Sequence, residues 1–219
     1  MRMKDKNWRR ANLALLLLII LLNSYIITLP FLPNVVFWWH SRSSSAEKTL
    51  TSRILEPKKT APDSSGTITK PSEAPTFHAD STHDGLIIPK MLLETPLVEG
   101  PMHDSFNLLN QGAWRLPIAN SPDKGGNTVI AGHRFSYTGP RGIFYFLNKL
   151  APGDLIGLWY HGKLYQYTVS TTRTVAASEV SVQEPTLDTR LTLYTCTPLF
   201  NPVNRLVVVA TPSSSEAKL

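Results

Sequence analysis

Cysteine is almost absent from this sequence: Cys196 is the only one among 219 residues. The chain therefore cannot form an intramolecular disulfide, and the thiol must have another reason to be there. A lone cysteine is either a small buried apolar residue or a reactive thiol. Residue type alone does not choose between these alternatives, so the choice depends on the surrounding sequence.

Metal-binding motifs are missing as well. No cysteine pair and no His-x-x-x-His spacing occurs, and the carboxylates of the C-terminal half are scattered rather than grouped at the spacing of a calcium loop. We therefore expect no metal site and no cofactor.

Net charge is low outside the N-terminus. The chain carries a formal charge of +6, of which residues 1–10 supply +4. The basic isoelectric point is thus mostly a property of this short N-terminal cluster, and it gives little reason to expect nucleic-acid binding.

A long apolar run follows the basic cluster. Ala11 to Leu29 is 19 residues long and, as a helix, spans about 28 Å, close to the thickness of a bilayer's hydrocarbon core. Prolines and aromatic residues follow it, so we expect residues 11–39 to form a signal anchor and its outer interface. The basic flank predicts a single-pass protein of the cell membrane, with residues 1–10 in the cytoplasm and the remainder outside. A cleaved signal peptide is the alternative, but no small-x-small site follows the run closely.

Residues 40–84 have the composition of a linker. They contain 16 serines or threonines and 4 prolines, with equal numbers of basic and acidic residues. The small apolar surface of such a segment cannot offset the entropy lost on ordering, so we expect a disordered tether with a span of roughly 35 to 40 Å. Residues 213–219 have the character of a loose tail.

From residue 85 to residue 212 the sequence changes to short β-branched and aromatic runs separated by turn residues. This pattern predicts an all-β domain, a sandwich or a closed barrel, rather than a layered parallel sheet. Short helices are expected over Ser105–Asn110 and Ile143–Leu150, and a hairpin turn at His161-Gly162. The expected strands are Leu86–Ile88, Pro96–Val98, Thr128–Gly132, Leu155–Tyr160, Lys163–Val175, Leu191–Thr195 and Leu206–Ala210.

Three chemically active side chains fall at the ends of such strands. Cys196 ends one run, His133 ends another 63 residues upstream, and Arg205 opens a third nine residues downstream. Gly132, directly before the histidine, permits close backbone approach. Rigid strands can aim a thiol, an imidazole and a guanidinium into one cleft, and this set suits nucleophilic catalysis by cysteine.

These stretches resemble the sortase family, the cysteine transpeptidases that attach proteins to bacterial cell walls. The similarity covers roughly residues 85–212 and rests on Thr-Leu-x-Thr-Cys at Thr192–Cys196, on Gly-His-Arg at Gly132–Arg134, and on Arg205 at the head of the next strand. Within that family the sequence is class D/E-like. The resemblance implies a closed eight-stranded β-barrel with short helices, which the strand pattern alone does not specify.

The resemblance also implies roles for the three side chains. Cys196 would be the nucleophile, and His133 would give a proton to the departing amine and take one from the incoming amine. Arg205 would hold the substrate carbonyl or the oxyanion that forms on attack.

The implied reaction is cleavage of a C-terminal Leu-Pro-x-Thr-Gly-like sorting signal through a thioacyl enzyme. The acyl group then passes to an amine of a peptidoglycan precursor or of a pilin lysine, so the expected partners are secreted proteins with sorting signals, such amines and the lipid bilayer. Leu193, Thr195 and Arg134 are expected to bind substrate. Two alternatives are a catalytically silent barrel that binds peptides or wall material, and an L,D-transpeptidase, whose Gly-Cys signature is absent because Thr195 precedes Cys196.

Overall fold

The structure is a computed structural model and describes residues 2–28, 34–35, 37–38, 44–57, 77–135, 142–199 and 201–213. The chain divides into two compact units, Met1–Ser44 and Ser45–Leu219. In the first unit, helix α1 (Arg2–Thr28) contains the apolar segment Ala11–Thr28, which has a mean hydropathy of 2.1 and no buried residue. Its length and composition are compatible with a membrane span. The prolines predicted to end this segment lie outside the described residues.

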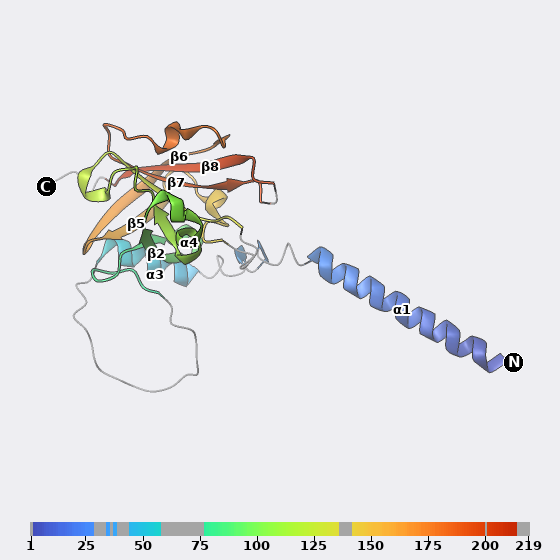
Figure 1. Cartoon of the computed structure of the whole chain (residues 1–219). Coiled ribbons are helices and arrows are strands. Elements are labelled where there is room, and N and C mark those ends of the chain that lie inside the picture. Colours follow the sequence, from blue (N-terminus) through green and yellow to red (C-terminus); the bar gives the residue numbers. More distant parts are fainter. Residues whose placement is uncertain are drawn as a thin grey trace. The chain divides into compact units, whose positions relative to one another are not determined.

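The second unit is built around a closed barrel of eight strands (Figure 1), which confirms the predicted fold. Around the barrel the order is β1-β2-β3-β4-β7-β8-β6-β5, and β5 pairs back with β1. The β2–β3 and β4–β7 pairs are parallel, and the other pairs are antiparallel. The strands are β1 (Gly85–Ile88), β2 (Leu93–Glu99), β3 (Ala113–Arg115), β4 (Asn127–Ala131), β5 (Leu155–Tyr160), β6 (Lys163–Ala176), β7 (Arg190–Thr197) and β8 (Asn204–Pro212).

The connections contain short helical segments. The predicted helix at Ser105 is confirmed as α4 (Ser105–Gln111), and the predicted hairpin turn joins β5 to β6, with positive φ angles of 48° and 77° at His161 and Gly162. The other described segments are 3₁₀ turns: η1 (Pro89–Met91), η2 (Met102–Asp104), η3 (Pro122–Lys124), η4 (Leu147–Lys149) and η5 (Val180–Gln183).

The helix predicted over Ile143–Leu150 is wrong. Turns and the single 3₁₀ segment η4 occupy this stretch. The N–H of Phe144 donates to the carbonyl oxygen of His133, and Phe144 and Leu147 are fully buried. Long-range hydrogen bonding and packing therefore replace the local bonds that an α-helix requires.

Successive side chains along β7 point alternately into the barrel interior and toward its outer face. Leu191 and Leu193 on β7 are fully buried in the interior, whereas Arg190, Tyr194 and Cys196 are only partly buried on the outer face. This alternation follows from the two-residue repeat of a β-strand. The outer faces of β4, β7, β8 and β6 together form the surface that carries Cys196, called the β7 face below.

Two connections cover parts of the β7 face. Helix α4 lies over β3 and β4, where Leu108 packs in a buried cluster with Trp114 and Val129. On the other side, the β6–β7 connection, residues 177–189, runs along the outside of the barrel (orange in Figure 1). Buried Asn127 anchors it, because its Nδ2 donates to the carbonyl oxygens of Val182 and Glu184 at 3.1 and 2.9 Å.

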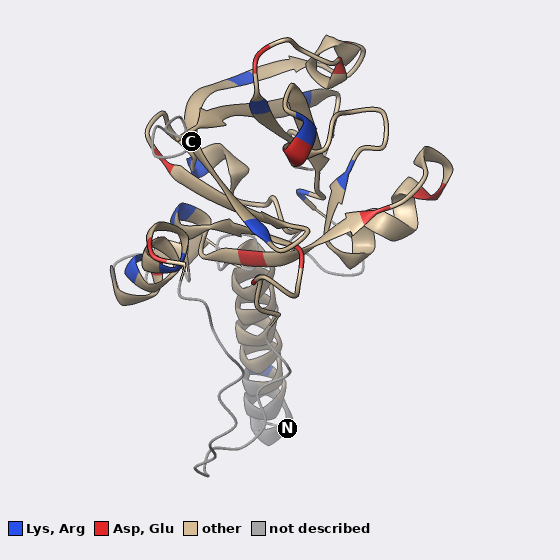
Figure 2. Cartoon of the chain, turned by 90° about the vertical axis from the view of Figure 1, so that its left-hand side faces the viewer, with Lys and Arg blue, Asp and Glu red and all other residues tan. Residues whose placement is uncertain are grey.

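Charged side chains are spread over the barrel. In the described part of the domain, neither basic nor acidic residues gather on one face (Figure 2).

Part of the predicted tether is ordered, so the prediction is wrong for residues 44–55. These residues form helix α3 (Ser44–Leu55), whose Ile54 is fully buried in a cluster with Ile87 and Leu164 of the barrel. Arg53 adds an ion pair, with Nη1 2.7 Å from Oε2 of Glu94. These partners are distant in sequence, which is why composition alone indicated disorder. Residues 58–76 of the predicted tether lie outside the described residues.

Replacing Ile54 by alanine is expected to lower the free energy of unfolding by about 2 to 4 kcal/mol, because it leaves a cavity where the side chain contacts the barrel. The adjacent Leu55→Ala is the matched control, since Leu55 is 58% exposed and should change stability by less than about 0.5 kcal/mol. Urea unfolding of the full-length chain in detergent micelles measures the free energy of unfolding of both variants. Equal stability of the two variants would contradict the packing of α3 as part of the folded unit.

Candidate active site

The three side chains predicted to act together lie in one row across neighbouring strands. Cys196 on β7 pairs directly with Arg205 on β8, and residues paired in this way project from the same face of the sheet. The parallel pairing of β4 with β7 extends to Ala131 and Tyr194, and His133 follows Ala131 by two residues, as Cys196 follows Tyr194. The Gly132 N–H, which donates to the carbonyl oxygen of Tyr194, continues this register past the end of β4. His133 is thereby brought to the level of Cys196, at about the 4.8 Å spacing of neighbouring strands. The thiol is therefore flanked by the imidazole segment on one side and the guanidinium on the other.

The His133 segment is held by close packing. A Cβ atom on Gly132 would come within 2.6 Å of the ring of Phe144, so glycine is required for the chains to approach this closely. The ring of Phe106, on α4, meets the imidazole edge to face, with ring centroids 6.4 Å apart. Burial lowers the pKa of His133 below its ordinary value of 6.5, so the imidazole is mostly neutral at neutral pH.

Arg205 is partly exposed beside the thiol. In the described part of the chain no carboxylate pairs with it, and its Nη1 donates only to the carbonyl oxygen of Asn204 at 3.1 Å. An arginine at a protein surface most often forms an ion pair. The other donors of Arg205 are thus available to a ligand that carries negative charge.

Two further side chains at this site were not predicted from the sequence. Phe106 is 72% exposed beside His133, and sequence contains no signal that brings α4 to this histidine. Tyr194 is the variable residue of the Thr-Leu-x-Thr-Cys motif, two residues before Cys196, and lies on the same β7 face. Burial raises its pKa to about 12, while nearby Arg205 opposes this shift, so the phenol stays protonated and able to donate a hydrogen bond.

The predicted substrate-binding residues are placed differently from one another. Leu193 is fully buried and Thr195 is 2% exposed, so neither side chain reaches the surface that carries Cys196. Thr195 instead donates from Oγ1 to the carbonyl oxygen of Gly132 at 2.7 Å, which ties β7 to the end of β4. Arg134 is partly exposed, and its Nη1 donates to Oγ1 of Thr197 at 2.6 Å.

This chain and its fold match a known family. A family model described as Sortase domain matches residues 86–213, more than half of the chain. The chain belongs to the sortase family. It is therefore a cysteine transpeptidase of the sortase type, as the sequence motifs predicted.

Curated relatives agree with this assignment. The sortase is 27% identical over 207 residues to Sortase A of Listeria monocytogenes, a match that covers 91% of this chain and 90% of that relative. It is also 33% identical over 138 residues to Sortase SrtE1 of Streptomyces coelicolor, covering 56% of this chain and 38% of that protein.

Solved structures share the barrel. The pilus-related Sortase C of Group B Streptococcus superposes with a TM-score of 0.54 at 25% identity, covering 63% of this chain and 70% of that one. The Clostridium perfringens Sortase D5 transpeptidase gives 0.52 at 25% identity, covering 60% and 79%. The names of these relatives span several sortase classes, so the similarity assigns the family, and the class D/E placement stays a prediction.

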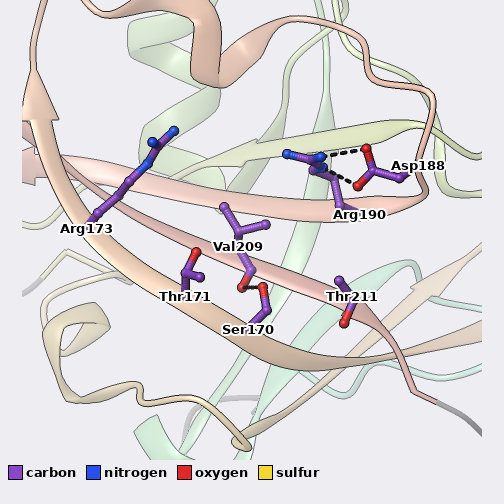
Figure 3. Close-up of a pocket in the computed structure, with 7 residues that line it drawn as sticks. All are labelled: Ser170, Thr171, Arg173, Asp188, Arg190, Val209 and Thr211. Carbon is purple, nitrogen blue, oxygen red and sulfur yellow. Dashed lines mark hydrogen bonds and ion pairs between the residues drawn. The ribbon is translucent and has the colours of Figure 1, made fainter.

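The sortase also has a cavity of about 390 Å³ on the β7 face, lined by the residues in Figure 3. It lies between β6, the far ends of β7 and β8, and the β6–β7 connection. Arg173 lines one side, and Arg190 on the other side donates from Nε and Nη2 to the two carboxylate oxygens of Asp188. Arg190 is six residues from Cys196 along β7, a distance of about 20 Å in a strand. The cavity is thus distinct from the row of His133, Cys196 and Arg205.

Among the described residues, no group of three or more histidine, cysteine, aspartate or glutamate side chains is placed to hold an ion.

Proposed function

We propose that this sortase cleaves a Leu-Pro-x-Thr-Gly-like signal at the C-terminus of secreted proteins. Cys196 is the nucleophile, His133 the general acid and base, and Arg205 the donor to the substrate oxygen. The acyl group is transferred to an amine of a peptidoglycan precursor or of a pilin lysine. The direct pairing of Cys196 with Arg205, with His133 just past the end of β4 in the register that leads to Cys196, is the observation that supports this proposal most.

Acylation begins when the thiolate of Cys196 attacks the threonine carbonyl carbon of the signal. A carbon–sulfur bond forms as the carbonyl π electrons move to the oxygen, and the oxyanion that results is stabilised by hydrogen bonds from Arg205. The tetrahedral species then expels the glycine amine, and His133, having received the thiol proton, passes a proton to this leaving nitrogen. The products are a thioester on Cys196 and a released glycine-containing peptide.

Deacylation repeats these steps with a different amine. The incoming nitrogen attacks the thioester carbonyl, His133 takes its proton, and the carbon–sulfur bond breaks to return the thiol of Cys196. One amide bond is exchanged for another, so the overall reaction needs neither an oxidant nor a cofactor.

We infer that α1 anchors the enzyme as a single-pass protein of the cell membrane. The apolar segment Ala11–Thr28 and the basic flank before it support this orientation, with the N-terminus in the cytoplasm and the barrel outside. Protection of the N-terminal residues, but not the barrel, from protease added to intact protoplasts checks this topology.

The proposal predicts a covalent acyl enzyme. The full-length chain in detergent micelles, mixed with sorting peptides that vary at their first two positions, should gain the mass of the peptide portion up to threonine. Added amine should remove this mass and yield the peptide–amine product, whereas a scrambled peptide should do neither. Peptide binding without any adduct across the whole panel would favour the catalytically silent barrel instead.

A further inference from the structure

Beyond the end of β4, side chains take over the connection between the segment that follows this strand and the last residues of β7. The ladder ends with Ala131 paired to Tyr194 and the N–H of Gly132 donating to the carbonyl oxygen of Tyr194 at 3.3 Å. The Thr195 hydroxyl then donates back to the carbonyl oxygen of Gly132 at 2.7 Å. One step further, Nη1 of Arg134 donates to Oγ1 of Thr197 at 2.6 Å.

These two side-chain bonds bracket the candidate catalytic pair. His133 lies between Gly132 and Arg134 in sequence, and Cys196 lies between Thr195 and Thr197, so each has one cross-strand bond before it and one after it. The chain that leaves β4 also turns back at this point, because the carbonyl oxygens of His133 and Arg134 accept from Phe144 and Gly142. The two backbone bonds from Phe144 and Gly142 hold the His133 segment in its own conformation. The side-chain bond from Arg134 connects this segment to the one that contains Cys196.

Stability does not explain Arg134. Its guanidinium is partly buried, and in the described part of the chain its buried Nε has no hydrogen-bond partner and no carboxylate pairs with it. Burial lowers the pKa of this group, since taking an uncompensated cation out of water costs free energy. An apolar side chain would avoid that cost, so the cation at this position points to a role other than stability.

We propose that Arg134 is a positioning residue whose bond to Thr197 fixes the separation of His133 from Cys196. This inference rests on the roles given to His133 and Cys196 in the proposed function. Proton transfer requires the donor and acceptor atoms within about 2.6 to 3.2 Å, and a displacement of about 1 Å lowers a rate by roughly 100-fold. A direct substrate contact by Arg134, the role expected from the sequence, would act on substrate affinity instead.

Four variants of the full-length enzyme in detergent micelles separate these roles. Arg134→Met and Thr197→Val each remove one end of the bond, and each is expected to lower kcat by about 10- to 100-fold with KM within about twofold of wild type. The double variant should be no slower than the slower single variant, because both changes break the same bond. Thr197→Ser keeps the hydroxyl and should keep wild-type kcat.

Arg115→Met is the matched control, since Arg115 on β3 is also partly buried but pairs with Glu99, outside the candidate site. It should cleave the sorting peptide at the wild-type rate. A raised KM with unchanged kcat in Arg134→Met would overturn the positioning role in favour of a substrate contact. Additive losses in the double variant would show that the two side chains do not act through a shared bond, and would overturn it as well.

A second measurement does not depend on the sorting reaction. Iodoacetamide alkylates the one thiol in the chain, and its rate against pH reports the coupled ionisation of the thiol and its neighbours. Arg134→Met and Thr197→Val should both move the midpoint of this profile by about half a pH unit or more, while Thr197→Ser and Arg115→Met should leave it in place. A wild-type profile in both bond-removing variants would reject the inference. If the wild-type enzyme cleaves no peptide but the two bond-removing variants still show these shifts, the proposed substrate is rejected and the positioning role of Arg134 stands.

Discussion

Replacing Cys196 by alanine is expected to lower the rate of sorting-peptide cleavage by about 10⁴-fold or more. The side chain supplies the sulfur of the proposed thioester, and the chain contains no other thiol to replace it. Binding of the peptide to the β7 face should persist, because the strands and connections that form this face are unchanged. Cleavage is measured by chromatography of the released glycine-containing fragment, and the acyl enzyme by intact-protein mass spectrometry.

The same variant tests whether the thiol has a structural role instead. Cys196 is only partly buried, so its loss should change the free energy of unfolding by less than about 0.5 kcal/mol. A thiol-specific reagent should label the wild-type chain once and the variant not at all. A stable Cys196→Ala variant that still cleaves the peptide at more than trace rates would remove Cys196 from the mechanism.

Replacing Arg205 by lysine is expected to reduce kcat by roughly 100- to 1,000-fold, the size of effect seen when an oxyanion donor is lost. Lysine keeps the positive charge but lacks the planar fork of donors, so the loss measures geometry rather than charge. KM should change much less, because the developing oxyanion exists only after attack. Steady-state cleavage of a fluorogenic sorting peptide gives both constants.

The pH dependence of kcat/KM provides an internal check on the Arg205→Lys variant. Burial lowers the pKa of His133, so its titration should place the acid limb of the profile below pH 6.5. That limb should keep its position in Arg205→Lys, because the positive charge is retained. Arg190→Lys, on the same face of β7 but paired with Asp188, should have wild-type kcat. An Arg205→Lys enzyme with near wild-type kcat would show that charge alone suffices, and would exclude the proposed role of the guanidinium fork.

Local patterns were sufficient for most of the barrel. β5 was predicted with its observed bounds, and the predicted segments of β7 and β8 lie inside the observed strands, because alternating apolar residues report the two-residue repeat of a half-buried strand. β3 was missed. It is three residues long, and its existence depends on parallel pairing with β2 and antiparallel pairing with β4, which no local pattern records.

Helix α3 was missed for a related reason. Its sequence is rich in serine and threonine and contributes one fully buried side chain, Ile54, so its composition resembles that of a disordered segment. The helix is stabilised by residues far away in sequence. Ile54 packs against Gly157, where an added Cβ would come within 2.8 Å of it, and Arg53 pairs with Glu94.

The sequence by itself determined seven of the eight strands, the apolar N-terminal helix and the three chemically active residues of the candidate site, because each depends on residue type and local repeat. Tertiary structure alone decided which of these residues meet. The register that sets Cys196 opposite Arg205, and His133 beside them, depends on pairing among strands up to 63 residues apart in the chain. A shift of one residue would turn every side chain of a strand to its other face, so burial of the barrel interior selects this register. Formation of the closed barrel also buried Leu193 and Thr195 and brought Arg134 within hydrogen-bond distance of Thr197. The pairing of the strands decides which neighbours of a motif face inward and which contact another strand.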